Sequence, residues 1–384
     1  MRINGALAVF SGLLLIYGCT SSKKTQGGHS PNISEIRFIS EYIIPNGMQF
    51  NGTTVGGLSG IDYDVKRDLY YMICDDPSAV NPARFYTAKI MIGRHGIDSV
   101  LFVRVDTLLN PEGKRYPDIR NDRIHSADLE AMRYDPSRDE FIWSSEGQRV
   151  LKDNIRDLQD PAIVITNRTG KYKDSFALPL NMHIRAEEKG PRHNSVFEGL
   201  SFDENYSHVY VNVEEPLYED GPKAGTGDST AVIRILKFDR HLKQCVAQYA
   251  YEISSVPYPA NPPGAFKING VSDILYAGRD KFIVIERAYS TGRIPTDIRI
   301  YLADASHAED ISFISSLKEQ PASKPITKKL LLDVNNTVRR DIFNIEGVTF
   351  GPRLANGHRS LLLVTDNNFN AKEKTQFFLF EVLP

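Results

Sequence analysis

One short motif recurs five times along this chain of 384 residues, and it limits the folds that the chain can adopt. The first copy is Leu58-Ser59-Gly60-Ile61-Asp62-Tyr63-Asp64, and the third is Phe197-Glu198-Gly199-Leu200-Ser201-Phe202-Asp203. The apolar anchors of the five copies lie about 71 to 74 residues apart, at Leu58, Leu129, Leu200, Ile274 and Val348. A nearly constant spacing indicates one structural unit repeated around or along a common axis.

The residues within each unit predict four short strands. Apolar runs bounded by Gly, Pro, Asp and Asn are typical of strands, and the first unit continues from its motif through Leu69–Ile73, Arg84–Met91 and Ile97–Val105. The fifth unit reaches only three strands before the chain ends. Ile36–Ile44, which no unit claims, can supply the missing strand.

These units predict an all-β fold, a β-propeller of five four-stranded blades in which the N-terminal strand closes the last blade. A six-bladed propeller is the alternative, if residues 303–327 contain further strands. In a propeller, the start of each first strand and the end of each second strand meet at one mouth. Long loops, among them Glu146–Asp160 and Ser254–Gly270, are expected at that mouth, where binding usually occurs.

The N-terminus is typical of a bacterial lipoprotein leader. Arg2 precedes an apolar run, Ala6 to Tyr17, which is followed by Gly18 and Cys19. We expect residues 1–18 to be a signal peptide, residues 19–33 a flexible tether, and residues 34–384 the propeller domain. Lipid attachment at Cys19 would hold the protein at the bacterial cell envelope, on the periplasmic side or at the cell surface. An ordinary signal peptide or a membrane helix fits less well, because the apolar run is short.

Bulk charge and cysteine content restrict the partners. The formal net charge is −2 and there is no stripe rich in Lys and Arg, so we do not expect a nucleic-acid partner. After Cys19, only Cys74 and Cys245 remain, and they fall in different units, so we expect two free thiols. We expect a monomer that takes a small anionic or ester ligand.

Acidic residues recur at the predicted mouth. Glu130, Glu198 and Glu346 stand at the start of first strands, and every unit has an acid at the end of its second strand, including Glu146 and Asp366. Carboxylates gathered near one axis would repel one another and raise their own pKa values. Such a group suits a hard cation, Ca²⁺ or Mg²⁺, or a general acid and base. Pairing with arginines such as Arg84, Arg133, Arg149 and Arg287 is the structural alternative.

Several of these segments resemble the phytase-like domain family, described as having the esterase-like activity of phytase. The similarity lies in Gly57-Leu58-Ser59-Gly60, Ser144-Ser145-Glu146-Gly147, Phe197-Glu198-Gly199-Leu200, Asn344-Ile345-Glu346-Gly347 and Val364-Thr365-Asp366-Asn367-Asn368-Phe369. It extends over residues 34–384. Blade 2 departs from the family pattern, because Ala131 follows Glu130 where glycine is usual.

The resemblance implies an exported propeller that hydrolyses phosphate or carboxylic esters with a bound divalent cation, Ca²⁺ first and Mg²⁺ as the alternative. It implies that Glu198 and Glu130 are catalytic and that Arg84 and Arg287 bind the substrate. The metal ligands that it implies are Glu130, Glu198, Glu346, Glu146 and Asp366. Two other functions stay open: a non-catalytic propeller that binds a ligand or partner at the envelope, and a Ca²⁺-dependent lactonase. Family membership alone does not establish catalysis.

Overall fold

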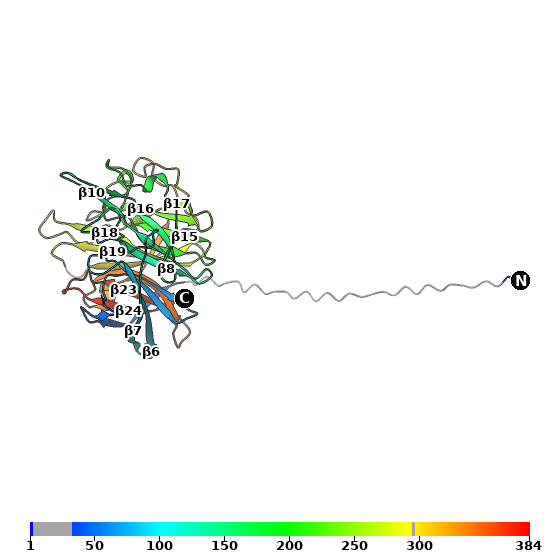
Figure 1. The fold of residues 1–384 in the computed structure, drawn as a ribbon. Helices are drawn as coiled ribbons and strands as arrows, with labels where there is room; N and C mark the ends of the chain where they lie inside the picture. Colours follow the sequence, from blue (N-terminus) through cyan, green and yellow to red (C-terminus); the bar gives the residue numbers. More distant parts are fainter. Residues whose placement is uncertain (3–32, 294–295) are drawn as a thin grey trace.

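Five antiparallel sheets of four strands each follow one another around a central axis in the computed structural model (Figure 1). The structure describes residues 1–2, 33–293 and 296–384. The innermost strands of neighbouring blades contact one another in a closed cycle. The fold is therefore a five-bladed β-propeller, as the repeat predicted.

The blades are listed here from the innermost strand outward. Blade I is β4 (Leu58–Asp64), β5 (Leu69–Cys74), β6 (Arg84–Gly93) and β7 (Gly96–Thr107); blade II is β8 (Leu129–Asp135), β9 (Glu140–Ser145), β12 (Ala162–Asn167) and β13 (Tyr172–Ser175); blade III is β14 (Phe197–Phe202), β15 (His208–Val213), β16 (Ala231–Asp239) and β17 (Gln244–Ile253); blade IV is β18 (Lys267–Gly278), β19 (Lys281–Ser290), β20 (Asp297–Asp304) and β21 (Thr327–Asp333); blade V is β22 (Asn344–Arg353), β23 (Arg359–Asp366), β24 (Thr375–Leu383) and β1 (Glu35–Ile44).

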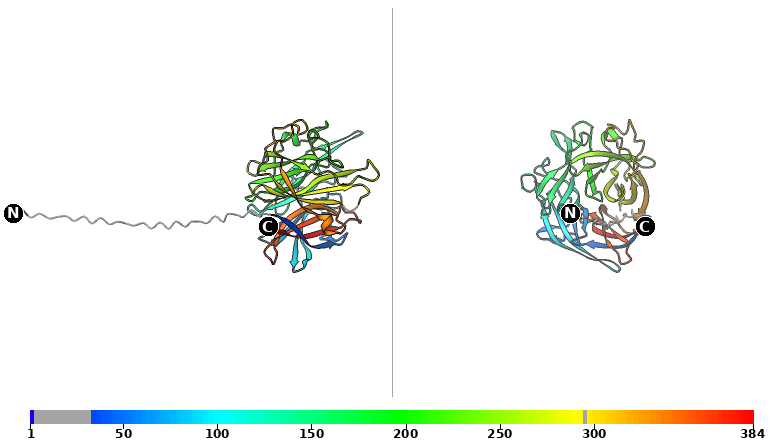
Figure 2. Two further views of the ribbon diagram at one scale, coloured as in Figure 1. Left: turned by 180° about the vertical axis from the view of Figure 1, so that it is seen from behind. Right: turned by 90° about the vertical axis from the view of Figure 1, so that its right-hand side faces the viewer.

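The two ends of the described propeller meet in blade V. β1 pairs antiparallel with β24, from Glu35 opposite Leu383 to Ile44 opposite Thr375. The blue and red ends of the colour scale accordingly lie side by side in Figure 2. The closure predicted for the N-terminal strand is confirmed.

Two short hairpins, one α-helical turn and two 3₁₀ turns lie outside the five blades. A hairpin of β10 (Gln148–Lys152) and β11 (Ile155–Gln159) rises where a plain loop was expected, and a second hairpin joins β2 (Gln49–Phe50) to β3 (Thr53–Thr54). One α-helical turn, α1 (Val334–Val338), and two 3₁₀ turns, Leu180–Met182 and Tyr218–Asp220, complete the elements. β18 begins at Lys267, inside the segment expected to be a loop.

The six-bladed alternative is wrong. Residues 305–326 contain no strand. Instead Ile311, Ile314 and Leu317 of this segment are buried with Ala250 on the outer strand of blade III. Arg234 donates hydrogen bonds to the carbonyls of Ile311 and Ile314, which fastens the segment to that blade.

Apolar side chains fill the spaces between blades. Trp143 of blade II is 1 % exposed and packs in a cluster with Ile73 and Phe85 of blade I. Cys74 and Cys245 are free, as expected. No helix within residues 33–293 and 296–384 combines the length and the apolar character that crossing a bilayer requires.

A buried ion pair ties the five blades together at the axis. Arg133 of blade II donates through Nη2 to Asp273 of blade IV, at 2.7 and 2.8 Å. The same guanidinium donates to the carbonyls of Leu200 in blade III and Ile61 in blade I. Asp273 also accepts the backbone N–H of Val348 in blade V at 2.8 Å. Every innermost strand therefore contacts this pair.

The leader, Cys19 and the tether lie outside the described residues, except for Met1, Arg2 and Ile33.

Candidate functional site

A break in strand register recurs at the start of every innermost strand. The β-ladder between the first two strands of each blade shifts at this point in all five blades. The residues in the break are Ser59, Glu130 with Ala131, Glu198 with Gly199, Ser272 and Glu346. A β-bulge changes the direction of the side chain that it carries, and here it carries a glutamate in three blades.

The glycine beside the bulge is explained by close contact between neighbouring blades. A Cβ atom added at Gly199 would lie 2.5 Å from the Cα of Asp273, and one at Gly347 would lie 3.0 Å from the N of Ile61. The innermost strands are thus too close for a larger side chain. This contact brings the bulges, and the acids that they carry, near one axis.

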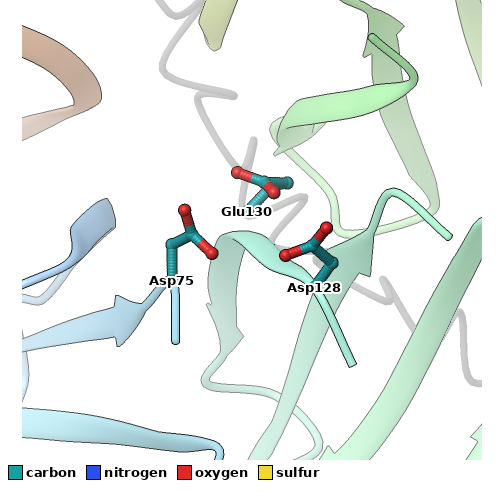
Figure 3. A group of neighbouring side chains, drawn as sticks. All are labelled: Asp75, Asp128 and Glu130. Carbon is teal, nitrogen blue, oxygen red and sulfur yellow. The ribbon is translucent and has the colours of Figure 1, made fainter. Parts of the chain in front are cut away.

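Five carboxylates from three blades converge there in two groups that share Glu130. One group is Asp75, Asp128 and Glu130, and the other is Glu130, Glu146 and Glu198. Within each group, one oxygen of every member lies within 4.8 Å of the others. Figure 3 shows the first group, with the three carboxylates turned toward one another.

Burial and mutual repulsion raise the pKa of these acids. Burial is the larger cause for Glu130 and Glu198, whose pKa values rise well above the ordinary range, and neighbouring glutamates add to it. Burial also raises the pKa of Asp128 to about 6, and it raises the pKa of Asp75 and Glu146 strongly. Two acids are partly fixed: Glu146 accepts the N–H of Val196 at 2.6 Å, and Asp128 accepts the amide of Gln148 at 3.0 Å.

Arg287 of β19, whose side chain is 15 % exposed, supplies a positive charge beside these acids. Its Nη2 lies 2.8 Å from Glu214 Oε1 and 3.6 Å from Glu346 Oε1. Burial raises the pKa of Glu214 to about 7 in spite of this arginine. The Nε of Arg287 and the Oε2 of Glu346 have no hydrogen-bond partner among the described residues.

These groups line a cavity of about 900 Å³ that opens at the predicted mouth. Asp75 and Asp128 also border a second cavity of about 630 Å³, together with Arg120, Arg123 and His193. The two cavities therefore meet at the first carboxylate group. A volume near 900 Å³ is typical of small-molecule sites.

The structure brings most of the predicted site residues together. Glu130, Glu146 and Glu198 form one group, and Glu346 lines the same cavity, where it accepts the amide of Asn344 at 2.7 Å. Asp366 is buried beside them without lining the cavity. Its Oδ1 accepts the N–H of Asn368 at 2.7 Å, and its Oδ2 has no partner within the described chain.

Arg84 lies elsewhere and differs from the expectation. Its side chain is 1 % exposed and donates to Asp76 at 2.6 Å, to Tyr86 and to the carbonyl of Thr54. It does not line the axial cavity. Arg84 thus orders the loop after β5, and it borders a separate cavity of about 430 Å³ instead of the axial one.

Asp75 and Asp128 were not among the predicted ligands. Asp75 was visible as an acid at the end of a second strand, and Asp128 precedes Glu130 by two residues. Because residues two apart on an extended chain point to the same side, the spacing of Asp128 and Glu130 is the signal that could have added Asp128 to the predicted ligands.

The donor set fits a hard divalent cation. Each group offers carboxylate oxygens alone, and buried acidic oxygens of Glu346 and Asp366 lack partners in the described chain. Ca²⁺ and Mg²⁺ prefer such ligands, and a cation would offset the repulsion among them.

Comparisons with known proteins identify the family of this chain. No curated protein matches the sequence. Among solved structures, the chain is similar to an exo-β-1,3-galactanase from Phanerochaete chrysosporium, solved with galactose. The sequence identity is 11 % and the TM-score is 0.45, and the alignment covers 89 % of this chain and 64 % of the galactanase. The chain thus spans less than two thirds of the galactanase. It is also similar to the periplasmic gluconolactonase of Pseudomonas aeruginosa, with 9 % identity, 87 % and 91 % covered, and a TM-score of 0.34.

The family model covers most of the chain. Residues 53–369 match the family described as "Phytase-like: Esterase-like activity of phytase". This match supports a hydrolase-type propeller and leaves the substrate and the cation undefined. The chain belongs to the phytase-like family.

Proposed function

We propose that this protein is a divalent-cation-dependent hydrolase of phosphate or carboxylic esters, with its active site in the axial cavity. The observation that carries the proposal is the convergence of Asp75, Asp128, Glu130, Glu146 and Glu198 from three blades into two overlapping groups of oxygen donors. Purely structural acids would be paired with cations, as Asp76 and Asp273 are.

Asp75, Asp128 and Glu130 would hold one cation, and Glu130, Glu146 and Glu198 would hold a second or share the first. A bound Ca²⁺ or Mg²⁺ polarises an ester oxygen and lowers the pKa of bound water. The Val196 N–H and the Gln148 amide hold Glu146 and Asp128 in position for that role.

Glu130 and Glu198 are placed to transfer a proton, and Arg287 is placed to bind the substrate. A bound cation would keep Glu130 and Glu198 ionised, so either carboxylate can accept a proton from the attacking water as a general base. The Nε of Arg287 is buried without an acceptor in the described chain, which leaves an N–H for an ester oxygen.

The depth of the site favours hydrolysis over simple binding. Glu130, Glu146, Glu198 and Glu214 are buried, so the cavity has a charged floor rather than a flat recognition surface. Ordered, desolvated charges are typical of catalytic sites.

The decisive experiment measures hydrolysis of p-nitrophenyl phosphate, p-nitrophenyl acetate and a lactone panel, by protein stripped with chelator and then supplied with Ca²⁺ or Mg²⁺. We expect turnover only with cation, and a loss of about 100-fold or more in kcat for Glu198→Gln. Calcium titration by calorimetry should show weaker binding to that variant. Glu252→Gln, on the exposed outer strand β17, is the matched control and should behave like wild type. Absence of turnover on every ester with cation present would contradict the proposal.

We further propose that lipid attachment at Cys19 holds this activity at the bacterial envelope. Cys19→Ala should release the protein from the membrane fraction, whereas Cys245→Ala should not.

A further inference from the structure

The axial cavity has two chemically different sides. The acids that converge on the axis come from blades I to III. Blades IV and V also contribute charged groups, Arg287 and Glu346 among them, but they and the segments before their innermost strands supply the apolar and aromatic lining: Phe266, Ile268, Tyr289, Ile342 and Phe343. A site for a purely ionic substrate would not need such a wall.

Phe266 and Tyr289 form the outer part of this wall. Their ring centroids are 6.1 Å apart with an interplanar angle of 37°. Phe266 is 59 % exposed, although it is a large apolar side chain at the edge of a cavity. Its carbonyl accepts two hydrogen bonds from Thr291, one from the N–H and one from Oγ1, both at 2.9 Å. The backbone therefore holds Phe266 in place, and its exposure is built into the fold.

The charge of the lining argues against a polyanionic ligand. Ten carboxylates and four cationic side chains line the cavity, a formal charge of −6 when every group is ionised. One divalent cation in each carboxylate group would still leave −2. Like charges brought into a buried site cost free energy, because the low local dielectric strengthens their repulsion.

Three of the four cationic side chains already have partners. Lys223 forms an ion pair with Glu215, Arg287 with Glu214, and the guanidinium of Arg293 lies 5.3 Å from the ring centroid of Tyr258. Little positive charge remains to receive several phosphate groups.

Building on the proposed function, we propose that the axial cavity selects esters of apolar cyclic alcohols with at most one negative charge, and that Phe266 and Tyr289 bind the ring of the alcohol. The ester group then faces the carboxylates, and the ring packs on the aromatic wall. A stacked aromatic contact of this kind contributes binding without taking part in bond cleavage. Phe266 is thus a specificity residue, not a catalytic one.

The test uses the full mature protein with Ca²⁺ and compares 2-naphthyl acetate, ethyl acetate and inositol hexakisphosphate. We expect 2-naphthyl acetate to be the best of the three by kcat/KM. Phe266→Ala should raise KM for 2-naphthyl acetate about 10-fold or more, with kcat within a few-fold of wild type, and should leave KM for ethyl acetate unchanged. Phe313→Ala is the control, because Phe313 is 77 % exposed and does not line the cavity.

A second measurement separates this inference from the proposed function. Binding of 2-naphthol, the alcohol product, is measured by calorimetry and needs no turnover; Phe266→Ala should weaken it about 10-fold or more. If no ester is cleaved but 2-naphthol binds through Phe266, the aromatic wall is supported and hydrolysis is contradicted. If esters are cleaved while inositol hexakisphosphate is preferred, or if Phe266→Ala changes neither KM nor naphthol binding, the inference is overturned.

Discussion

The carboxylates at the axis have raised pKa values because folding takes them out of water and places them beside one another. Asp128 rises from its ordinary 3.8 to about 6, and Glu214 from 4.5 to about 7, with burial the larger cause in both. A raised pKa means that the folded state binds the proton more tightly than the unfolded state. The stabilisation that protonation provides is complete below the ordinary pKa and is lost as pH rises through the raised one.

We therefore predict that the free energy of unfolding of wild type falls as pH rises from about 4 to about 7, with chelator present. The double variant Asp128→Asn/Glu214→Gln lacks both titrating groups, so its free energy of unfolding should fall less over the same range. Urea unfolding at several pH values measures the difference. Added Ca²⁺ should reduce the loss, because the cation binds the ionised carboxylates and competes with protons. Parallel pH profiles of the two proteins in chelator would count against this explanation.

At the scale of the element, the bulge and the small residue after it place the glutamates. Gly199 and Gly347 allow neighbouring innermost strands to touch, whereas blade II tolerates Ala131 at the same point. Serine hydroxyls reinforce the contacts: Ser144 donates to the carbonyl of Glu198 at 2.8 Å, and Ser272 donates to that of Ile345 at 2.9 Å.

Gly199→Ala should destabilise the fold by about 1–3 kcal/mol, because the new methyl group would overlap the backbone of Asp273 and Ile274. The same shift moves Glu198 relative to Glu130, so Ca²⁺ affinity should fall as well. Ala131→Gly is the matched control and should cost less than about 1 kcal/mol. Denaturant unfolding and calcium calorimetry measure the two effects; unchanged stability in Gly199→Ala would show that the strands can move apart freely.

At the scale of the whole molecule, Arg133 and Asp273 join the five blades. Both side chains are almost fully buried, and their partners include backbone groups of Leu200, Ile61 and Val348. Removing one member leaves the other charge or its partners unsatisfied at the centre of the ring.

We predict that Arg133→Met destabilises the propeller by about 3–5 kcal/mol in chemical denaturation. Adding Asp273→Asn to that variant should restore part of the loss, since it removes the stranded carboxylate. Arg138→Met, which breaks the more exposed pair with Asp135 in the same blade, should cost less. If Arg133→Met and Arg138→Met lowered the stability equally, the axial ion pair would contribute no more to stability than the exposed one, and the prediction would be wrong.

The repeat made the architecture predictable, because each copy marks the innermost strand of one blade. The N-terminal strand belongs to no copy, and without it blade V is the one blade of the described propeller that lacks a fourth strand. Glu130, Glu146 and Glu198 were predictable for the same reason. The pairing of Arg84 with Asp76 was not, since it depends on how the loop after β5 turns back on itself. Asp128 stands just before β8 and two residues before Glu130, a spacing that puts both side chains on the same side of an extended chain and could have indicated the pair.

The hairpin of β10 and β11 was not predicted from the sequence either. Its strands expose Leu151 and Ile155, so it lacks the buried face whose alternating pattern reveals a strand. The aromatic wall was not predicted for a different reason: the contact between Phe266 and Tyr289 depends on where β18 begins.

The pairing of β1 with β24 has a consequence for the order of events on the ribosome. β1, the first strand of the propeller along the chain, pairs with β24, the last of its strands, and Ser34 Oγ donates to the carbonyl of Pro384 at 2.6 Å. A nascent chain must therefore keep β1 unpaired until β24 has been synthesised. The ring closes late in synthesis, so a stop codon that removes β24 (Thr375–Leu383) would leave the edges of β1 and β23 open on an otherwise finished propeller.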